Sequence, residues 1–310
     1  MGDDTGPIKH KQKLADEGHT CKHTPGMFAE DTNVILLKEN LAPNIHLLKI
    51  DAPAIAGKVQ AGQFVIIRIG EKGERIPLTF ADWDKEEGSI TIIFMQVGTS
   101  THKLALMQPG DSITNIVGPL GIPTDIKKYG TVLCVGGGIG IAPVAPVARA
   151  LKAAGNKVIS IIGARGKELL FWEDRLRNIS DELIVCTDDG SYGRGVLVTE
   201  VLHELCGSGQ QIDRVFAIGP AIMMKFCAEA TRQFGVKTIV SLNSIMVDGT
   251  GMCGCCRVSV GGQTRFACVD GPEFDAHQVD WDELMSRQRT YIDEEKYSLS
   301  EWQRKQCNTA

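Results

Sequence analysis

The stretch from Thr131 to Pro143, TVLCVGGGIGIAP, decides how the second half of this chain folds. Its first part, TVLCVGG, is a short apolar run, which is typical of a buried strand. The residues that follow, IAPVAPVARALKAAG, have helical periodicity and end at a glycine. A strand, a glycine-rich turn and a helix in this order are typical of the carboxyl edge of a parallel sheet, where open α/β proteins have their binding crevice.

The same alternation continues toward the C-terminus. KVISIIGAR, ELIVCTDDG and RVFAIGP are typical of strands, and KELLFWEDRLRNI, VLVTEVLHELC and AIMMKFCAEATRQFG are typical of helices. Strands that alternate with helices predict a doubly wound parallel sheet. We assign this α/β domain to residues 127–240.

The residues before it have a different texture. NVILLKENLAPNIHLLKIDAP, GQFVIIRIG and SITIIFMQVG are short β-rich runs separated by glycine, proline and charged clusters, which predicts a small antiparallel β-barrel over 29–126. Residues 1–28 are polar, and we expect a flexible extension there rather than a metal site built from its scattered histidines. After a cysteine-rich lobe at 241–276, residues 277–310 are expected to be a polar helical segment.

Composition excludes several classes of protein. The chain has 310 residues, 43% of them apolar, and a net charge of −5, which predicts two or three ordinary globular domains without a basic surface for nucleic acid. Neither a membrane span nor a secretory signal is expected. The ten cysteines are therefore expected to be reduced thiols in the cytoplasm.

Three glycine- or hydroxyl-rich stretches are candidate phosphate sites. Gly136, Gly137, Gly138, Ile139 and Gly140 lie between a strand and a helix, where backbone amides can approach a pyrophosphate. The usual dinucleotide fingerprint is incomplete, because its third glycine falls on Ile141, so a tight turn without a ligand is the alternative.

Two further stretches lie in the barrel. In GERIPLTF, Arg75 can pair with a phosphate and Thr79 can hydrogen-bond a flat polar ring. In VGTSTHKL, the residues Gly98, Thr99, Ser100 and Thr101 offer amides and hydroxyls at the start of a helix. An exposed arginine and a simple N-cap are the alternatives. Gly219 and Pro220 follow the last strand, where a helix start is an equally good interpretation.

The segment IMVDGTGMCGCCRVSV, residues 245–260, carries the metal candidates. Cys253 and Cys256 form a C-x-x-C pair, and Cys268 follows a predicted hairpin around Gly261-Gly262. Three thiolates on a glycine-rich loop favour a [2Fe–2S] cluster, whereas structural zinc normally has a second pair. The fourth ligand is either Cys255, which adjoins Cys256, or Asp248, whose spacing matches the plant-type C-x4-C-x2-C pattern. Free thiols are the remaining alternative.

RIPLT in a barrel, VGGGIGIAP on a parallel sheet and a cysteine lobe, in this order, resemble the ferredoxin-reductase superfamily. Within it, the chain resembles the electron-transfer subunits of dihydroorotate dehydrogenase and sulfide dehydrogenase. The stretch SLNSIMVDGTGMCGCCRVSV resembles still more closely that of the small subunit of NADH-dependent ferredoxin:NADP oxidoreductase, an electron-bifurcating transhydrogenase. The dihydroorotate branch has cysteine where this chain has Asp248, so the resemblance favours Asp248, Cys253, Cys256 and Cys268 as ligands.

The resemblance also implies FAD and NAD(H) as cofactors. FAD would lie against Arg75, Pro77, Leu78, Thr79, Gln96, Val97, Gly98, Thr99, Ser100 and Thr101. NAD(H) would lie on Gly136 to Gly140, with Asp188, Asp189, Gly219 and Pro220 nearby. Arg165 follows the second strand of the parallel sheet, where an arginine can favour NADP(H), so the choice between the two nucleotides stays open.

These residues imply an oxidoreductase in which the cofactors transfer hydride and electrons and no side chain acts as acid or base. We expect electrons to pass between NAD(H), FAD and a [2Fe–2S] cluster, and to or from a larger flavin or iron–sulfur subunit that serves ferredoxin. An electron-transfer subunit of a sulfide or dihydroorotate dehydrogenase complex is the alternative. A zinc-binding regulatory module on a flavoprotein fold is the non-enzymatic rival.

Overall fold

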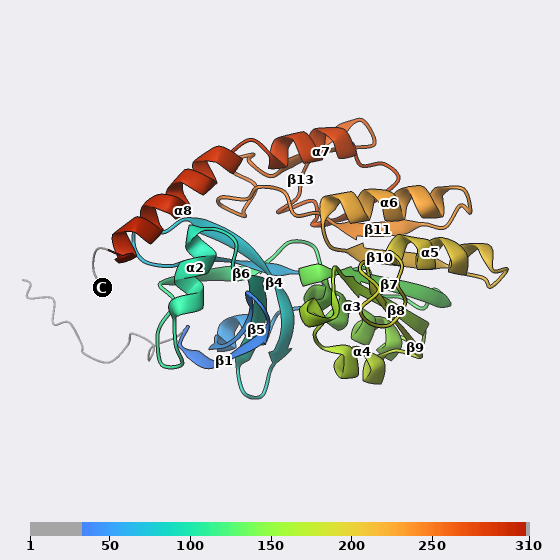
Figure 1. Ribbon diagram of the computed structural model, residues 1–310, viewed down its shortest axis with the longest axis horizontal. Coiled ribbons are helices and arrows are strands. Elements are labelled where there is room, and N and C mark those ends of the chain that lie inside the picture. The colour runs from blue at the N-terminus through green and yellow to red at the C-terminus, as the bar shows by residue number, and fades with distance from the viewer. Residues whose placement is uncertain (1–32, 308–310) are drawn as a thin grey trace, which may run out of the picture. The chain divides into compact units, whose positions relative to one another are not determined.

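The computed structural model describes residues 33–307, so the predicted extension at 1–28 lies outside the described residues. Within that range the three predicted parts, an antiparallel barrel, a doubly wound sheet and a β-rich lobe, are all present (Figure 1). The fold predicted from the sequence is confirmed. No helix in residues 33–307 is long and apolar enough to cross a membrane.

The barrel is a six-stranded antiparallel sheet in the order β1-β2-β5-β4-β3-β6. Its elements are β1 (Ile35–Ala42), β2 (Ile45–Asp51), α1 (Pro53–Ala56), β3 (Phe64–Arg68), β4 (Arg75–Asp84), β5 (Ser89–Met95), α2 (Thr99–Leu106) and β6 (Asn115–Leu120). Alternating side chains of these strands enclose a core of their own that includes Phe80, Phe94 and Leu104, all 2% exposed or less.

The second sheet has five parallel strands and one antiparallel edge strand, in the order β14-β11-β10-β7-β8-β9. Its strands are β7 (Thr131–Gly137), β8 (Lys157–Ala164), β9 (Glu182–Thr187), β10 (Arg214–Ile218), β11 (Thr238–Ser241) and β14 (Glu273–Asp275). Its helical elements are η1 (Gly138–Gly140), α3 (Ile141–Ala153), η2 (Lys167–Leu169), α4 (Glu173–Ile179), α5 (Val198–Gly207) and α6 (Ala221–Arg232). The order reverses between β7 and β10, which places the crevice of the sheet beside η1.

One predicted helix begins later than the sequence pattern indicates. KELLFWEDRLRNI was expected to be helical throughout, but α4 begins at Glu173 after the short turn η2. Trp172 stands at the N-cap in a left-handed conformation with φ 59°, which a continuous helix cannot contain. Burial of Phe171 beside it holds this bend in place.

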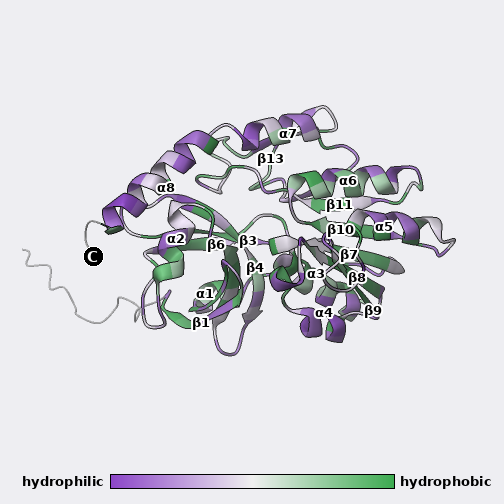
Figure 2. Ribbon diagram, in the orientation of Figure 1, coloured by the Kyte–Doolittle hydropathy of each residue, from purple (hydrophilic) through white to green (hydrophobic). Residues whose placement is uncertain are grey.

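Helix α3 is buried on both sides and joins the barrel to the parallel sheet. Its residues Ile141, Ala142, Val144 and Ala145 share one apolar cluster with strand residues of both sheets, among them Ala81 and Ile93 of the barrel. Figure 2 shows α3 and the central strands as largely hydrophobic, whereas α4 and α8 (Ile292–Cys307) are largely hydrophilic. The small alanine side chains let both sheets approach the same helix closely.

An ion-pair group reinforces this junction. Asp82 on β4 accepts hydrogen bonds from Arg149 on α3, at 2.7 Å, and from Arg175 on α4. Burial alone would raise the pKa of Asp82, but the two guanidinium groups hold it below its usual value. Each arginine also stacks on a tryptophan, Arg149 on Trp83 and Arg175 on Trp172. The carboxylate therefore remains charged between two planar cations.

The lobe after β11 contains the predicted hairpin, β12 (Arg257–Val260) and β13 (Gln263–Phe266). Gly261 and Gly262 connect the strands with φ of 60° and 74°, which is the backbone that a two-residue hairpin turn requires. The chain then returns to the parallel sheet as β14 and ends in α7 (Trp281–Gln288) and α8.

Asn156 fastens the segment between the two sheets. Its Oδ1 accepts from the amides of Tyr129 and Gly130, at 2.6 and 3.1 Å, and its Nδ2 donates to the carbonyls of Lys127 and Leu151, both at 2.8 Å. The side chain is buried. We predict that Asn156→Ala lowers the free energy of unfolding by roughly 2–4 kcal/mol, because it leaves backbone groups without partners.

Urea denaturation of the parent protein and of Asn156→Ala measures this difference in unfolding free energy. Gln60→Ala, which removes an exposed amide, should change the unfolding free energy by less than about 0.5 kcal/mol. Equal stabilities of the two variants would contradict the role given to Asn156.

Glu273 at the start of β14 makes stability depend on pH. Burial raises the pKa of its carboxyl to about 7 from 4.5, although the Thr124 hydroxyl donates to it at 2.6 Å. A raised pKa means that the folded protein binds the proton more tightly than the unfolded chain, so stability is lost as pH rises from 4.5 to 7. We predict that Glu273→Gln abolishes this loss and stabilises the protein at pH 8, by at most about 3 kcal/mol.

Melting temperatures between pH 5 and pH 8 test this prediction. Glu294→Gln, an exposed position on α8, should keep the slope of the parent protein. Identical pH slopes for Glu273→Gln and the parent would show that Glu273 is not the group responsible.

Candidate functional site

The glycine turn lies directly against the end of β10. A side-chain carbon on Gly140 would come within 2.1 Å of the Ile218 carbonyl, and one on Gly137 within 2.1 Å of the Met223 sulfur. Gly219 in turn lies beside the Gly137 carbonyl and Met223. The structure therefore brings the predicted nucleotide residues Gly136 to Gly140 together with Gly219 and Pro220, at a distance that only residues without side chains allow.

This turn also contacts the barrel. Element η1 packs against β5, whose next residue is Gln96. The Gln96 backbone amide donates to the Asn44 carbonyl at 2.8 Å, and its side-chain oxygen lies 3.1 Å from His46 Nε2. The predicted nucleotide turn and the predicted flavin residue Gln96 thus meet at the junction between the two sheets.

The other predicted flavin residues come from β4 and the start of α2. Arg75, Pro77, Leu78 and Thr79 lie along β4, paired with β3. At α2, the Thr101 hydroxyl accepts from the amides of Val97 and Gly98 at 2.9 and 3.0 Å. The Ser100 hydroxyl donates to Glu74 at 2.9 Å, which connects the first turn of α2 to the residue before Arg75. The two predicted phosphate-binding stretches are therefore neighbours.

Helix α8 packs on this same helix. The Thr99 and Ser298 hydroxyl oxygens lie 3.0 Å apart, and the rings of His102 and Trp302 meet edge to face with centroids 5.7 Å apart. The polar C-terminal segment thus covers one side of α2. No local sequence pattern predicts this contact, because it joins positions about 200 residues apart.

The metal candidates lie on a loop of glycines and short side chains. Gly249, Gly251 and Gly254 all have positive φ, between 68° and 86°, which favours glycine at each position. The Asp248 carboxylate faces into this loop and accepts from the amides of Met252 and Cys253, both at 3.2 Å. The Thr250 hydroxyl is the main cause of the lowered pKa of Asp248, which keeps the carboxylate ionised.

The thiols form two adjoining pairs. Cys256 and Cys268 are 2% exposed, and their sulfurs lie 3.1 Å apart. Burial and the Cys256 thiol raise the pKa of Cys268 to about 12. Cys253 is exposed, and the amide of Cys255 lowers its pKa. Among the residues at 33–307, no three His, Cys, Asp or Glu side chains are already grouped as metal ligands.

The donor set nevertheless fits a [2Fe–2S] cluster. Asp248 contacts Cys253, Cys253 adjoins Cys255, and Cys268 lies against Cys256 and the Gly251 amide. Backbone amides directed at sulfurs are the outer contacts that such clusters use. Asp248 and Cys253 form one contacting pair of the proposed ligands, and Cys256 and Cys268 form the other. The thiol of Cys255 contacts Cys253, and this contact raises the pKa of Cys255.

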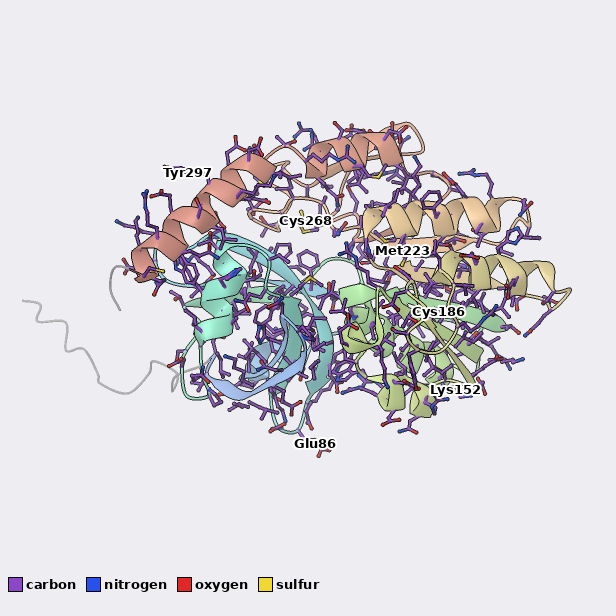
Figure 3. The ribbon with its side chains drawn as sticks, viewed as in Figure 1. Glu86, Lys152, Cys186, Met223, Cys268 and Tyr297 are labelled. Atoms are coloured by element: carbon purple, nitrogen blue, oxygen red, sulfur yellow. The ribbon has the colours of Figure 1, made fainter. Side chains whose placement is uncertain are left out.

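The loop rests on the barrel strands next to the predicted flavin residues. A side-chain carbon on Gly249 would lie 2.8 Å from Ile66 on β3 and 2.9 Å from Leu120 on β6, and Ile66 pairs with Pro77 on β4. Figure 3 shows Cys268 between the barrel and the C-terminal helices. The loop of the predicted cluster ligands therefore contacts β3, the strand next to the predicted flavin strand β4.

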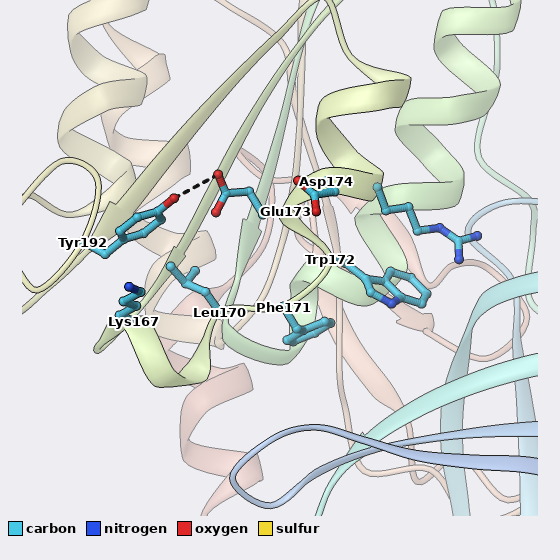
Figure 4. Close-up of a pocket in the computed structure, with 8 residues that line it drawn as sticks. Lys167, Leu170, Phe171, Trp172, Glu173, Asp174 and Tyr192 are labelled. Atoms are coloured by element: carbon cyan, nitrogen blue, oxygen red, sulfur yellow. Dashed lines mark hydrogen bonds between the residues drawn. The ribbon is translucent and has the colours of Figure 1, made fainter.

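Sequence reasoning missed a pocket at the carboxyl ends of β8 and β9. It has a volume of about 550 Å³ and is lined by Lys167, Leu170, Phe171, Trp172, Glu173, Asp174, Arg175 and Tyr192 (Figure 4). The Tyr192 hydroxyl donates to Glu173 at 3.2 Å, and the Lys167 ammonium lies over the Tyr192 ring. The amides of Asp188 and Asp189 bond to the carbonyls of Ala164 and Arg165, which brings both predicted aspartates to this edge.

Comparison with known proteins agrees with this arrangement. Residues 243–280 match the family model of the iron–sulfur cluster binding domain of dihydroorotate dehydrogenase B. A Thermotoga maritima protein named as a homolog of the dihydroorotate dehydrogenase B (NAD(+)) electron transfer subunit is 51% identical over 86% of this chain and 94% of its own length. The electron transfer subunit itself from Geobacillus thermodenitrificans is 33% identical over 82% of this chain and 99% of its own length.

Solved structures give the same result. A chain from a structure of NADH-dependent reduced ferredoxin-NADP oxidoreductase, described for its insights into flavin-based electron bifurcation, is 48% identical, with a TM-score of 0.84 over 89% of this chain and 99% of that one. Phthalate dioxygenase reductase, at 17% identity and a TM-score of 0.54, shares the fold. The relatives at 33–51% identity over most of both lengths show that this chain belongs to the family of dihydroorotate dehydrogenase B electron transfer subunits and their homologues.

Proposed function

We propose that the chain is an electron-transfer subunit that passes electrons between NAD(H), FAD and a [2Fe–2S] cluster. A larger flavin- and iron–sulfur-containing subunit would exchange these electrons with it in a bifurcating ferredoxin:NADP oxidoreductase, and ferredoxin would be served through that complex. The 48% identity to a chain of such an oxidoreductase, over 99% of that chain, supports this complex. The reduced thiols of the lobe suit the cytoplasm.

The positions of the nucleotide turn and the cysteine loop on the barrel are the main support for this proposal. The nucleotide turn η1 packs on the barrel at β5, and the cysteine loop packs on the barrel at β3 and β6. The predicted flavin strand β4 lies between β3 and β5 in the sheet. The predicted flavin strand is thus flanked by the predicted nucleotide turn on one side and by the loop of the predicted cluster ligands on the other, which is the order that a relay needs.

The residues of the chain bind and orient the cofactors rather than reacting themselves. When bound, the flavin supplies hydride exchange with nicotinamide and single-electron exchange with the cluster. We propose that Arg75, Gly98 and the amides of Thr99 to Thr101 hold the flavin phosphates and that Pro77, Leu78, Thr79, Gln96 and Val97 line its ring. We propose that the pyrophosphate of the nucleotide binds at the start of α3, where Gly137 and Gly219 pack closely beside Met223 and the helix N-terminus attracts negative charge.

The residues after β8 favour one of the two nucleotides and one position for its adenosine half. Gly166 lies within reach of the carboxylates of both Glu168 and Asp189, and Arg165 beside it is exposed. Carboxylates after the second strand favour the ribose hydroxyl of NAD(H) over the phosphate of NADP(H). We therefore propose NAD(H), with its adenosine end in the aromatic pocket at Trp172 and Tyr192.

An electron-transfer subunit of a dihydroorotate or sulfide dehydrogenase complex is the second candidate. The name of the Geobacillus relative favours the former, and the aspartate at position 248 favours the bifurcating complex. Co-purification from the native cell separates them, because the partner subunits differ in cofactor and substrate.

The proposed ligands predict a specific pattern of iron loss. Asp248→Ala, Cys253→Ala, Cys256→Ala and Cys268→Ala should each reduce the iron content well below two atoms per chain or alter the EPR spectrum of the reduced cluster, because each removes one of four ligands. Cys255→Ala and Cys307→Ala should keep both. Metal analysis and EPR on anaerobically purified protein measure this.

Loss of iron in Cys255→Ala together with an unchanged Asp248→Ala would reverse the choice of the fourth ligand. Zinc in place of iron in the parent protein would contradict the cluster altogether.

The flavin residues predict a change in cofactor retention. Arg75→Ala should weaken FAD binding by roughly 10-fold or more, because a charge-assisted bond to a phosphate is lost. Lys72→Ala, which removes an exposed cation from the turn before β4, should retain FAD like the parent. Flavin fluorescence after gel filtration or dialysis measures the bound fraction. Equal retention in the two variants would remove Arg75 from the flavin site.

A further inference from the structure

Two arginines hold consecutive carbonyl groups inside the C-x-x-C loop. The Arg257 guanidinium donates to the Gly254 carbonyl at 3.3 Å, and the Arg287 guanidinium donates to the Cys255 carbonyl at 3.1 Å. Both carbonyls lie between the proposed ligands Cys253 and Cys256. Arg257 is an exposed residue of the lobe itself, whereas Arg287 is half-buried and comes from α7, about thirty residues later in the chain.

Because each peptide group is planar, these contacts with carbonyls also determine where the next N–H groups of the loop point. A trans peptide is planar, so its carbonyl and its N–H point in opposite directions. An arginine outside the loop that binds the Gly254 carbonyl therefore turns the Cys255 N–H inward. That N–H does face the Cys253 sulfur. By the same geometry, the hydrogen bond from Arg287 to the Cys255 carbonyl directs the Cys256 N–H to the opposite side of that peptide, away from Arg287.

Hydrogen bonds at both ends of helix α7 hold it, and with it Arg287, in place against the lobe. The Asp280 side chain caps α7 by accepting from the Glu283 amide at 2.9 Å, and the buried Trp281 donates to the Ala276 carbonyl at 3.0 Å. Gln288, the residue after Arg287, donates to Asn243 Oδ1 at 2.7 Å, near the start of the lobe. Figure 1 shows α7 over the hairpin of the lobe.

We propose that Arg287 is a positioning residue for the [2Fe–2S] centre, which it serves by fixing the Cys255 carbonyl so that the loop amides face the sulfurs. This rests on the proposed function. It also gives Cys255 a role through its backbone rather than its thiol. Reduction adds an electron to the cluster, and both inward amides and a nearby guanidinium stabilise that added negative charge. Arg287 should therefore raise the reduction potential and slow the loss of iron.

Three variants separate orientation from charge. Arg287→Gln loses the cation and the planar fork, Arg287→Lys keeps the cation alone, and Arg289→Gln removes an exposed cation two residues away. The measurements are the rate of iron release to a chelator and the midpoint potential from an EPR-monitored redox titration. Circular dichroism confirms that each variant is folded.

Arg287→Gln should release iron roughly 10-fold faster than the parent and have a more negative midpoint potential, because outer contacts of this kind typically contribute 10-fold or more to metal retention. Arg289→Gln should match the parent in both, and Arg287→Lys should lie between them. Equal shifts in Arg287→Gln and Arg289→Gln would show that only the net charge of the protein matters, which would contradict a positioning role. The absence of a shift in both Arg287 variants would also overturn the proposal. A parent protein without iron would instead refute the proposed function itself.

Discussion

The burial of α3 on both of its sides is the constraint on which the rest of the structure depends. One face of this helix closes the parallel sheet, and the other packs on the barrel through Ala81 and Ile93. Because α3 begins where the glycine turn ends, the turn cannot move away from the barrel without opening the shared core. The ion-pair group at Asp82 adds a directional contact to this apolar one, from the strand that carries the predicted flavin residues.

The cysteine lobe is positioned by a second shared core. Cys256, Val258 and Cys268 lie in one cluster with Phe64 and Ile66 of the barrel and with Leu133 and Val135 of the parallel sheet. Two of the proposed ligands are therefore core residues, while Cys253 and Asp248 stand at the exposed end of the loop. Burial of this kind fixes half of the ligand set before any metal binds and leaves the other half free to adjust.

Much of this arrangement could be predicted from local sequence signals. The glycine turn, the Gly261-Gly262 hairpin and the alternation of strands and helices each depend on neighbouring residues, and each was predicted correctly. The late start of α4 was missed because helical periodicity does not reveal that Trp172 adopts a left-handed conformation. The contacts of Arg287 with Cys255 and of Ser298 with Thr99 join distant parts of the chain, and no local pattern signals them. The pocket at Tyr192 was missed for the same reason, since two separate loops form it.

The proposed relay takes electrons from a nucleotide through a flavin to a cluster within this one chain. Anaerobic titration of the purified protein with NADH, followed by visible absorption and by EPR of samples frozen at each step, detects each part of this path. We expect bleaching of the flavin to be accompanied by the EPR signal of a reduced [2Fe–2S] cluster in the same protein. A flavin that bleaches while an intact cluster stays oxidised, although the cluster potential is high enough for NADH to reduce it, would contradict the relay.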